Sequence, residues 1–175
     1  MRIGNNENEK KVILYKQQIE KELTEICEDL LALIKNHLIA NSTSDEARVF
    51  FLKMKADYYR YIAEYAVSSQ KDQSCSQAEK AYSEAWELAQ TTLTTTHPVR
   101  LGLALNYSVF FYEIKKSPEK ACNMAKQAFD EAIADLDHVQ DEYYKDATLI
   151  MQLLRDNLTL WTSELIEDEN TATLK

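Results

Sequence analysis

Glycine and proline are almost absent from this chain, and no other feature of the sequence constrains its fold as strongly. Only 2 glycines and 2 prolines occur among 175 residues. Because these residue types end helices and shape tight turns, their scarcity indicates long helices joined by short connections. An all-β sandwich would need turn residues about every ten positions. We therefore predict an all-α protein.

Apolar residues recur at three- and four-residue steps along most of the chain, which is typical of amphipathic helices. Short loops between consecutive helices favour antiparallel neighbours, so we predict an array of about six antiparallel helices. The predicted helices cover about 5–38 and 44–67, a segment between a polar turn at 68–74 and the threonines at 91–96, segments opening at His97-Pro98 and Ser117-Pro118, and about 143–163. Residues 164–175 are acidic and lack a periodic apolar face, so we predict a disordered tail there.

The composition and charge of the chain limit its partners. Hydrophobic residues make up 45% and charged residues 28%, a mixture typical of a globular protein, and the formal net charge is −9. An acidic surface argues against nucleic acid or an anionic membrane as the main partner, although it leaves room for a local basic pocket. No apolar stretch approaches the roughly 18 residues of a membrane span. We expect a cytoplasmic protein.

The sequence contains no pattern typical of an enzyme. The three histidines, His37, His97 and His138, lie in different segments, and no H-E-x-x-H or G-x-S-x-G motif occurs. Two glycines cannot build a phosphate-cradling loop. We therefore predict no catalytic residues, no metal site and no cofactor.

The helix predicted at 44–67 carries a possible anion-binding group. Lys53 and Arg60 are seven residues apart and so lie two turns apart on one face, with Tyr61 beside them. A lysine charge, a planar guanidinium and a phenol donor suit a doubly charged phosphate. The alternative is that these are ordinary surface charges paired with Asp57 or Glu64, and composition alone favours it.

The segment 101–113 combines an apolar stripe with polar side chains. Leu105 and Val109 are one turn apart, while Asn106 and Glu113 are two turns apart on a neighbouring face. An asparagine offers both a donor and an acceptor, which matches the backbone of an extended peptide, and Gly102 allows close backbone approach. A core helix with a polar edge remains the alternative.

The last predicted helix carries an asparagine within an apolar stripe. Leu149, Leu153, Leu160 and Trp161 lie close to one line along the helix, and Asn157 lies among them. A polar side chain on such a stripe needs a partner, which either the core or a ligand supplies.

Taken together, these segments are similar to the 14-3-3 family, a resemblance that runs over about residues 15–163. It is carried by the ordered stretches 51–61, 97–106, 117–122, 128–133 and 149–163. The resemblance implies an adaptor that dimerises and binds phosphorylated client proteins in an amphipathic groove. It implies phosphate binding by Arg60, Tyr61 and Lys53, peptide-backbone contacts by Asn106, Asn157 and Glu113, and an apolar wall of Leu105, Val109, Leu149, Ile150, Leu153, Leu160 and Trp161.

The resemblance also implies a departure from the family pattern. The family's domain begins with two short helices and the start of a long third, so residues 1–163 are expected to be a 14-3-3 domain without these first helices. The absent part supplies two basic residues of the phosphate cluster and much of the dimer interface. We expect apolar stripes to be exposed at Leu23, Leu30, Val49 and Phe50. We also expect phosphopeptide binding to weaken by several kcal/mol, at about 1.5–3 per charged contact. A helical scaffold that binds partners without phosphate dependence remains the alternative.

Overall fold

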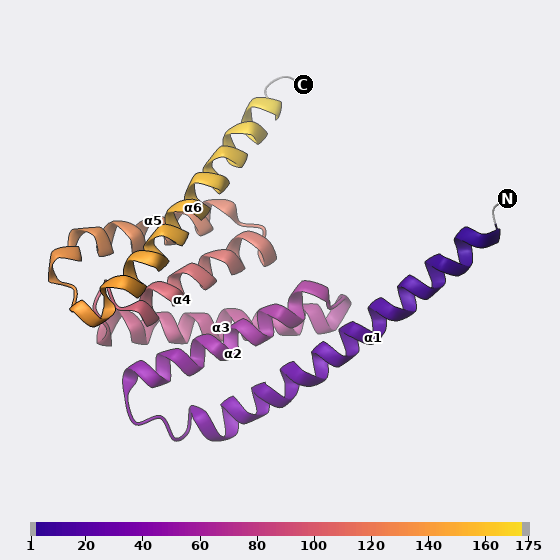
Figure 1. Cartoon of the computed structure of the whole chain (residues 1–175), viewed down its shortest axis with the longest axis horizontal. Coiled ribbons are helices and arrows are strands. Elements are labelled where there is room, and N and C mark those ends of the chain that lie inside the picture. The colour runs from indigo at the N-terminus through magenta and orange to yellow at the C-terminus, as the bar shows by residue number, and fades with distance from the viewer. Residues whose placement is uncertain (1–2, 173–175) are drawn as a thin grey trace.

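The computed structural model describes residues 3–172, and this range folds into six α-helices without a β-strand (Figure 1). Two π-helical turns and one 3₁₀ turn extend or connect the α-helices. The elements are α1 (Ile3–Leu33), η1 (Ile34–Leu38), α2 (Asp45–Tyr65), α3 (Ser68–Thr92), α4 (Pro98–Val109), η2 (Phe110–Ile114), α5 (Pro118–Ala134), η3 (Leu136–His138) and α6 (Asp141–Ala172). The prediction of an all-α fold is confirmed. None of the helices in 3–172 is both long and apolar enough to cross a membrane.

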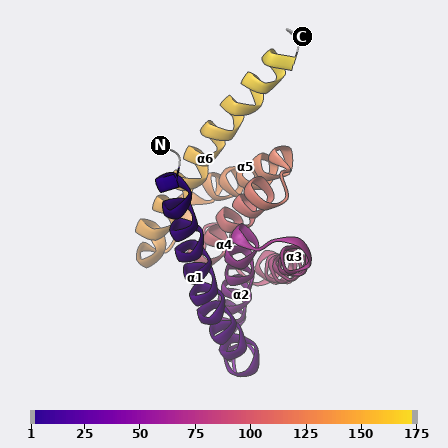
Figure 2. The same ribbon diagram turned by 90° about the vertical axis from the view of Figure 1, so that its right-hand side faces the viewer.

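The helices form an array in which each packs against its neighbours in the sequence. α2 lies between α1 and α3, as the view in Figure 2 shows, and it packs most extensively on α3. α4 contacts α5 and α6, and it also reaches back to α2. The N-terminal half of α1 and the C-terminal part of α6 project beyond the body of the array (Figure 1). The contact of α4 with both α2 and α6 is what brings the candidate site together.

Helix ends follow the capping signals in the sequence. The side chain of Ser44 accepts a hydrogen bond from the backbone N–H of Ala47 and caps α2. Pro98 and Pro118 lie in the first turns of α4 and α5. A backbone N–H at this position has no partner within the helix, so the lack of one in proline costs little. The predicted starts of these three helices are confirmed.

Small residues allow the helices of the core to approach one another closely. α3 buries Ala78, Ala81, Ala85 and Ala89, which recur every three or four residues along one face. Val49, which was predicted to be exposed, is fully buried in the same core. The prediction was wrong because Val49 shares its face of α2 with other buried residues spaced three and four positions along the helix.

The predicted turn at 68–74 is also wrong, because α3 already begins at Ser68. The chain reverses within Ala66 and Val67, which have extended backbones, and Ser68 itself has a positive φ of 51°. Polar residues such as Gln70 and Gln73 are exposed on the first turns of α3 rather than in a loop. Polarity in this stretch reflects a solvated helix face, which the sequence pattern does not distinguish from a turn.

The tail predicted to be disordered at 164–175 is helical as far as Ala172, and its last three residues lie outside the described range. The continuation has a simple physical reason. Residues 164–169 include glutamate, leucine and isoleucine and contain neither glycine nor proline, so nothing in them interrupts a helix that is already formed.

Candidate functional site

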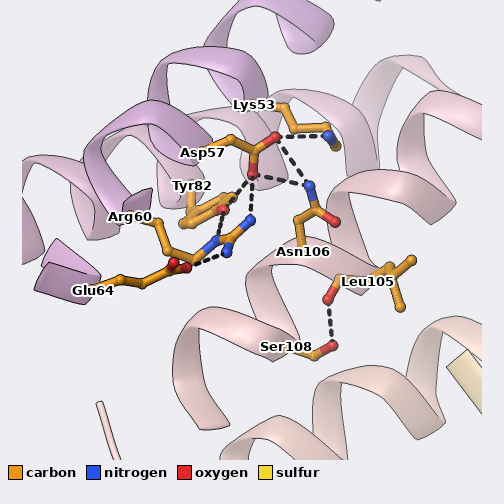
Figure 3. Close-up of polar contacts among 8 residues, drawn as sticks. All are labelled: Lys53, Asp57, Arg60, Glu64, Tyr82, Leu105, Asn106 and Ser108. Carbon is orange, nitrogen blue, oxygen red and sulfur yellow. Dashed lines mark hydrogen bonds and ion pairs between the residues drawn. The ribbon is translucent and has the colours of Figure 1, made fainter. Parts of the chain in front are cut away.

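A buried carboxylate, Asp57 on α2, lies at the centre of the candidate site (Figure 3). Lys53 Nζ donates to Asp57 Oδ2 at 2.8 Å, and Tyr82 Oη on α3 donates to Oδ1 at 2.5 Å. Asn106 Nδ2 on α4 lies 3.0 Å from each of the two carboxylate oxygens. One side chain therefore connects α2, α3 and α4 through donors that all point at it. We call Lys53, Asp57, Arg60, Tyr82 and Asn106 the Asp57 cluster.

Arg60 lies beside this carboxylate and is almost as buried, with 8% of its surface exposed. Its Nε donates to Tyr82 Oη at 3.1 Å, its Nη1 donates to Glu64 Oε1 at 2.8 Å, and its Nη2 lies 3.7 Å from Asp57 Oδ1. The guanidinium carbon is 4.7 Å from the centre of the Tyr61 ring. A guanidinium has five N–H donors, and two of them are used in these hydrogen bonds. Arg60 is thus held firmly and keeps donors for a ligand.

The charge states of the cluster follow from its burial and contacts. Burial, followed by the charge of Asp57, raises the pKa of Tyr82 well above its ordinary value, so its hydroxyl keeps its proton and donates a hydrogen bond to Asp57. Burial by itself lowers the pKa of Arg60, but the contacts with Tyr82 and Asp57 outweigh this effect and the net pKa is raised. Arg60 therefore stays charged at every pH at which the protein is folded.

The regular spacing of α2 explains why these groups meet. Lys53, Asp57, Arg60 and Glu64 follow one another at steps of four, three and four residues, which places all of them on one face of the helix. On α4, a Cβ added to Gly102 would lie 3.7 Å from the end of the Lys53 stem and 4.0 Å from the Ile150 side chain of α6. The glycine therefore lies where α2, α4 and α6 come together.

The other predicted polar residues lie outside the Asp57 cluster. Glu113 is exposed on η2 and lines, together with Glu64, a hollow of about 460 Å³. Asn157 is half-buried on α6, and Tyr61 is partly exposed beside Arg60. Within residues 7–167 the structure joins neither Glu113 nor Asn157 to the Asp57 cluster by a hydrogen bond. Their predicted roles toward a peptide remain predictions.

The predicted apolar wall divides into exposed and buried members. Leu149, Leu153 and Leu160 are exposed along α6, and Leu105, Val109 and Ile150 are half-buried. Trp161 differs from the rest because only 4% of its surface is exposed. Its ring stacks on Tyr112 with 4.7 Å between the centres and 12° between the planes. Trp161 therefore supports the wall from within the core.

Sequence reasoning missed the central role of Asp57 and the participation of Tyr82. Asp57 was considered only as a local partner for the cations of α2, and Tyr82 only as one member of the apolar face of its helix. The structure does contain the pairings named in the alternative interpretation, since Lys53 contacts Asp57 and Arg60 contacts Glu64. A tyrosine on an alanine-rich buried face is a signal, because its hydroxyl needs a buried partner.

The chemistry available here is binding of an anion by positioned donors. Lys53 and Arg60 supply charge and the Tyr61 hydroxyl supplies a neutral donor. The Asn106 amide nitrogen already donates to Asp57, so this side chain offers its oxygen as an acceptor for an N–H group beside the anion. No group of three or more His, Cys, Asp or Glu side chains is placed to hold a metal ion among the residues that the structure describes.

Comparison with known proteins shows that most of the chain matches one protein family. The model of the 14-3-3 protein family matches residues 2–162. The 14-3-3-like protein GF14 iota of Arabidopsis thaliana is 56% identical over 172 residues, which are 98% of this chain and 64% of the relative. The 14-3-3 protein 7 of Solanum lycopersicum is 57% identical over 94% of the chain and 65% of the relative. The 14-3-3 protein beta/alpha of Gallus gallus is 57% identical over 94% of the chain and 69% of the relative. The chain thus spans about two thirds of the length of these relatives.

Proposed function

Because this chain belongs to the 14-3-3 family, we propose that it is a non-catalytic signalling adaptor that binds client proteins containing phosphoserine or phosphothreonine. The observation that carries the proposal is the pairing of the buried Arg60 with Lys53 across Asp57, with donors on both cations left for a ligand. In this proposal Arg60, Lys53 and Tyr61 hold the phosphate.

The neighbouring helices supply what an extended peptide needs. The hydrogen bonds from its amide nitrogen to Asp57 hold the Asn106 side chain in one orientation, so the direction of its amide oxygen is also fixed. We assign Asn106, Asn157 and Glu113 to contacts with the peptide backbone and its surroundings. The exposed leucines of α6 would cover the apolar side chains that flank the phosphorylated residue, since this surface is otherwise open to solvent.

The proposal is tested by titrating a fluorescent phosphoserine peptide and its unphosphorylated twin into the chain and following anisotropy. We expect binding of the phosphopeptide alone, and we expect Lys53→Glu to abolish it. Lys126→Glu is the matched control, because it makes the same change of charge at an exposed position of α5, where Lys126 pairs with Asp130. Equal binding of the two peptides would support the alternative, a helical scaffold that recognises partners without phosphate.

We also infer that α1 contacts a second 14-3-3 chain. Its apolar residues Val12, Tyr15, Ile19, Leu23 and Ile26 follow three- and four-residue steps, and all of them are exposed. An uninterrupted apolar stripe of this length is typical of a protein interface. The test is the mass measured by light scattering for the wild type and for an Ile19→Glu variant.

We expect the Ile19→Glu substitution to shift the mass toward that of a single chain. Ile133→Glu is the control, because Ile133 is exposed to a similar degree, 50% against 46%, but lies on α5. A wild-type mass equal to that of one chain at all concentrations would contradict dimerisation through α1.

A further inference from the structure

A second concave surface lies on the other side of α2 from the Asp57 cluster. Its floor is formed by Tyr59 and Ile62, each two residues after a member of that cluster and so about 200° further round the helix. α1 with η1 forms one wall and α3 forms the other (Figure 2). The volume is about 390 Å³, which is within the range of small-molecule sites. We call this surface the outer cleft.

Ser74, on the α3 wall of the outer cleft, is a buried polar side chain without a partner. Only 5% of its surface is exposed, and its hydroxyl makes no hydrogen bond with any residue that the structure describes. Among the described residues, no side-chain nitrogen or oxygen is both fully buried and without a hydrogen bond. The small exposed part of Ser74 therefore includes the hydroxyl oxygen, which opens into the cleft that the residue lines. A molecule in the cleft would supply the hydrogen bond that the protein does not.

The other polar groups around the outer cleft also lack partners. Tyr59 on the floor, Asn36 on η1, and Gln70 and Gln73 on α3 make no side-chain hydrogen bond within the described part of the chain. Burial raises the pKa of Tyr59, so its hydroxyl is a neutral group. An amide offers both a donor and an acceptor, which are the two groups that a peptide backbone needs. The outer cleft thus contains uncommitted donors and acceptors, whereas those of the Asp57 cluster bind one another.

Opposite charges lie at the two ends of the α1 wall. Glu28 and Lys35 are seven residues apart and both line the outer cleft, so about 10 Å separates them along the helix. Neither makes an ion pair within residues 7–167. Between them the lining is apolar, with Leu31 on the wall and Ile62 on the floor. The outer cleft therefore has an anionic end, an apolar middle and a cationic end.

The cationic end of the outer cleft lies on η1, the π-helical turn that follows α1. Lys35 and Asn36 belong to this turn, in which the backbone N–H of Ile39 donates to the carbonyl of Ile34 at 2.9 Å. Turns of this kind are rare in helices and frequently occur at functional sites. Their position here agrees with a role of Lys35 and Asn36 in binding.

We propose that the outer cleft binds a free short peptide of about three residues as its zwitterion. The ammonium group lies at Glu28, the carboxylate lies at Lys35, and the backbone lies along Ser74 and the amides of α3. An extended chain spans about 3.3–3.6 Å per residue, so three residues match the distance of about 10 Å between the charged ends. An apolar side chain at the middle residue would contact Leu31 and Ile62. A ligand with one charge would leave either Glu28 or Lys35 unpaired.

The probe for this proposal is the tripeptide Gly-Leu-Gly. It is titrated into the isotope-labelled full chain, and binding is followed by the backbone amide chemical shifts of the protein. We expect a Kd on the order of 0.1–1 mM, typical of a ligand of this size, with the shifts concentrated at Asn36, Gln73 and Ser74. Blocking either the ammonium group by acetylation or the carboxylate by amidation should weaken binding by about two- to fivefold, because each block removes one exposed charged contact.

Variants of the two charged residues test which end of the peptide each one contacts. In Glu28→Gln, acetylation of the probe should no longer weaken binding, and in Lys35→Gln the same should hold for amidation. Glu25→Gln and Lys145→Gln are the matched controls, because both residues are exposed on helices outside the outer cleft and should keep the effect of both blocks. Ser74→Ala should weaken binding by about two- to tenfold without lowering the urea midpoint, because the hydroxyl makes no hydrogen bond in the free chain.

Four results would overturn the proposal. The first is equal binding of Gly-Leu-Gly and of its doubly blocked form. The second is full retention of both blocking effects in Glu28→Gln and Lys35→Gln. The third is displacement of Gly-Leu-Gly by the phosphoserine peptide, which would place the tripeptide at the Asp57 cluster instead. The fourth is the absence of any shift at probe concentrations up to about 10 mM.

Discussion

Replacing Asp57 with alanine should destabilise the chain far more than replacing any exposed carboxylate. Only 8% of the Asp57 side chain is exposed, and it accepts hydrogen bonds from Lys53, Tyr82 and Asn106. Its removal leaves the buried Tyr82 hydroxyl and the Arg60 guanidinium without this partner. Removing one member of a buried ion pair costs about 3–5 kcal/mol, and we expect Asp57→Ala to fall in that range.

The measurement is urea unfolding followed by circular dichroism, with Glu64→Ala as the comparison. Glu64 also pairs with Arg60, but 47% of its side chain is exposed, so its loss should cost no more than about 1 kcal/mol. A second comparison combines Asp57→Ala with Asn106→Ala, and we expect the two losses to be less than additive because they remove one shared contact. A loss below about 1 kcal/mol for Asp57→Ala would refute the central role of this carboxylate.

Three further predictions concern helix ends and packing. Burial lowers the pKa of His97, and its Nδ1 accepts from the backbone N–H of Val99, so stability should fall once the pH drops below about 6.5, the pKa of the unfolded side chain, and should keep falling until the pH passes the lower pKa of the folded state. His97→Asn should remove this part of the pH dependence of the urea midpoint. Gly102→Ala should stabilise the chain by about 0.5–1 kcal/mol in the same assay, because its Cβ would make only ordinary contacts. Trp161→Ala should cost about 3–5 kcal/mol, whereas Leu160→Ala, 55% exposed, should cost far less; a similar loss for both would contradict the buried position of Trp161.

The fold was predictable from sequence because its signals are local. The cap at Ser44 and the prolines at 98 and 118 each act within one helical turn, and the observed helices begin where these signals predict. Glycine and proline are otherwise scarce, so little in the chain interrupts a helix once it has formed. The errors arose where a pattern has two physical meanings. A polar stretch is either a turn or a solvated helix face, and at 68–74 it is the latter.

The candidate site was only partly predictable for a different reason. The spacing of Lys53 and Arg60 places both on one face of α2 whatever that helix packs against. The links from Asp57 to Tyr82 and Asn106 depend on how α3 and α4 pack on α2, across separations of 25 and 49 residues. Periodicity identifies the face of each helix but not the face that it meets.

The exposure of Glu64 leads to a last prediction about the proposed phosphate site. In the free chain the charges of Lys53 and Arg60 are balanced by Asp57 and Glu64, so this group of four has no net charge. Asp57 is buried and fixed, whereas Glu64 is half-exposed. The hydrogen bond described between Glu64 and Arg60 uses only Nη1 of the guanidinium. A phosphate that binds Arg60 must therefore displace Glu64 or lie beside its negative charge.

Glu64→Gln should for this reason strengthen phosphopeptide binding, by roughly two- to fivefold for an exposed charge whose effect is up to about 1 kcal/mol. The gain should shrink as salt is added, because exposed charges are screened. Glu131→Gln is the matched control, since Glu131 pairs with another arginine, Arg100, at 2.9 Å, and neither residue belongs to the proposed peptide site. Unchanged or weaker binding of the phosphopeptide by Glu64→Gln in anisotropy titrations would show that the phosphate does not compete with Glu64, and the assignment of Arg60 to the phosphate would then fail.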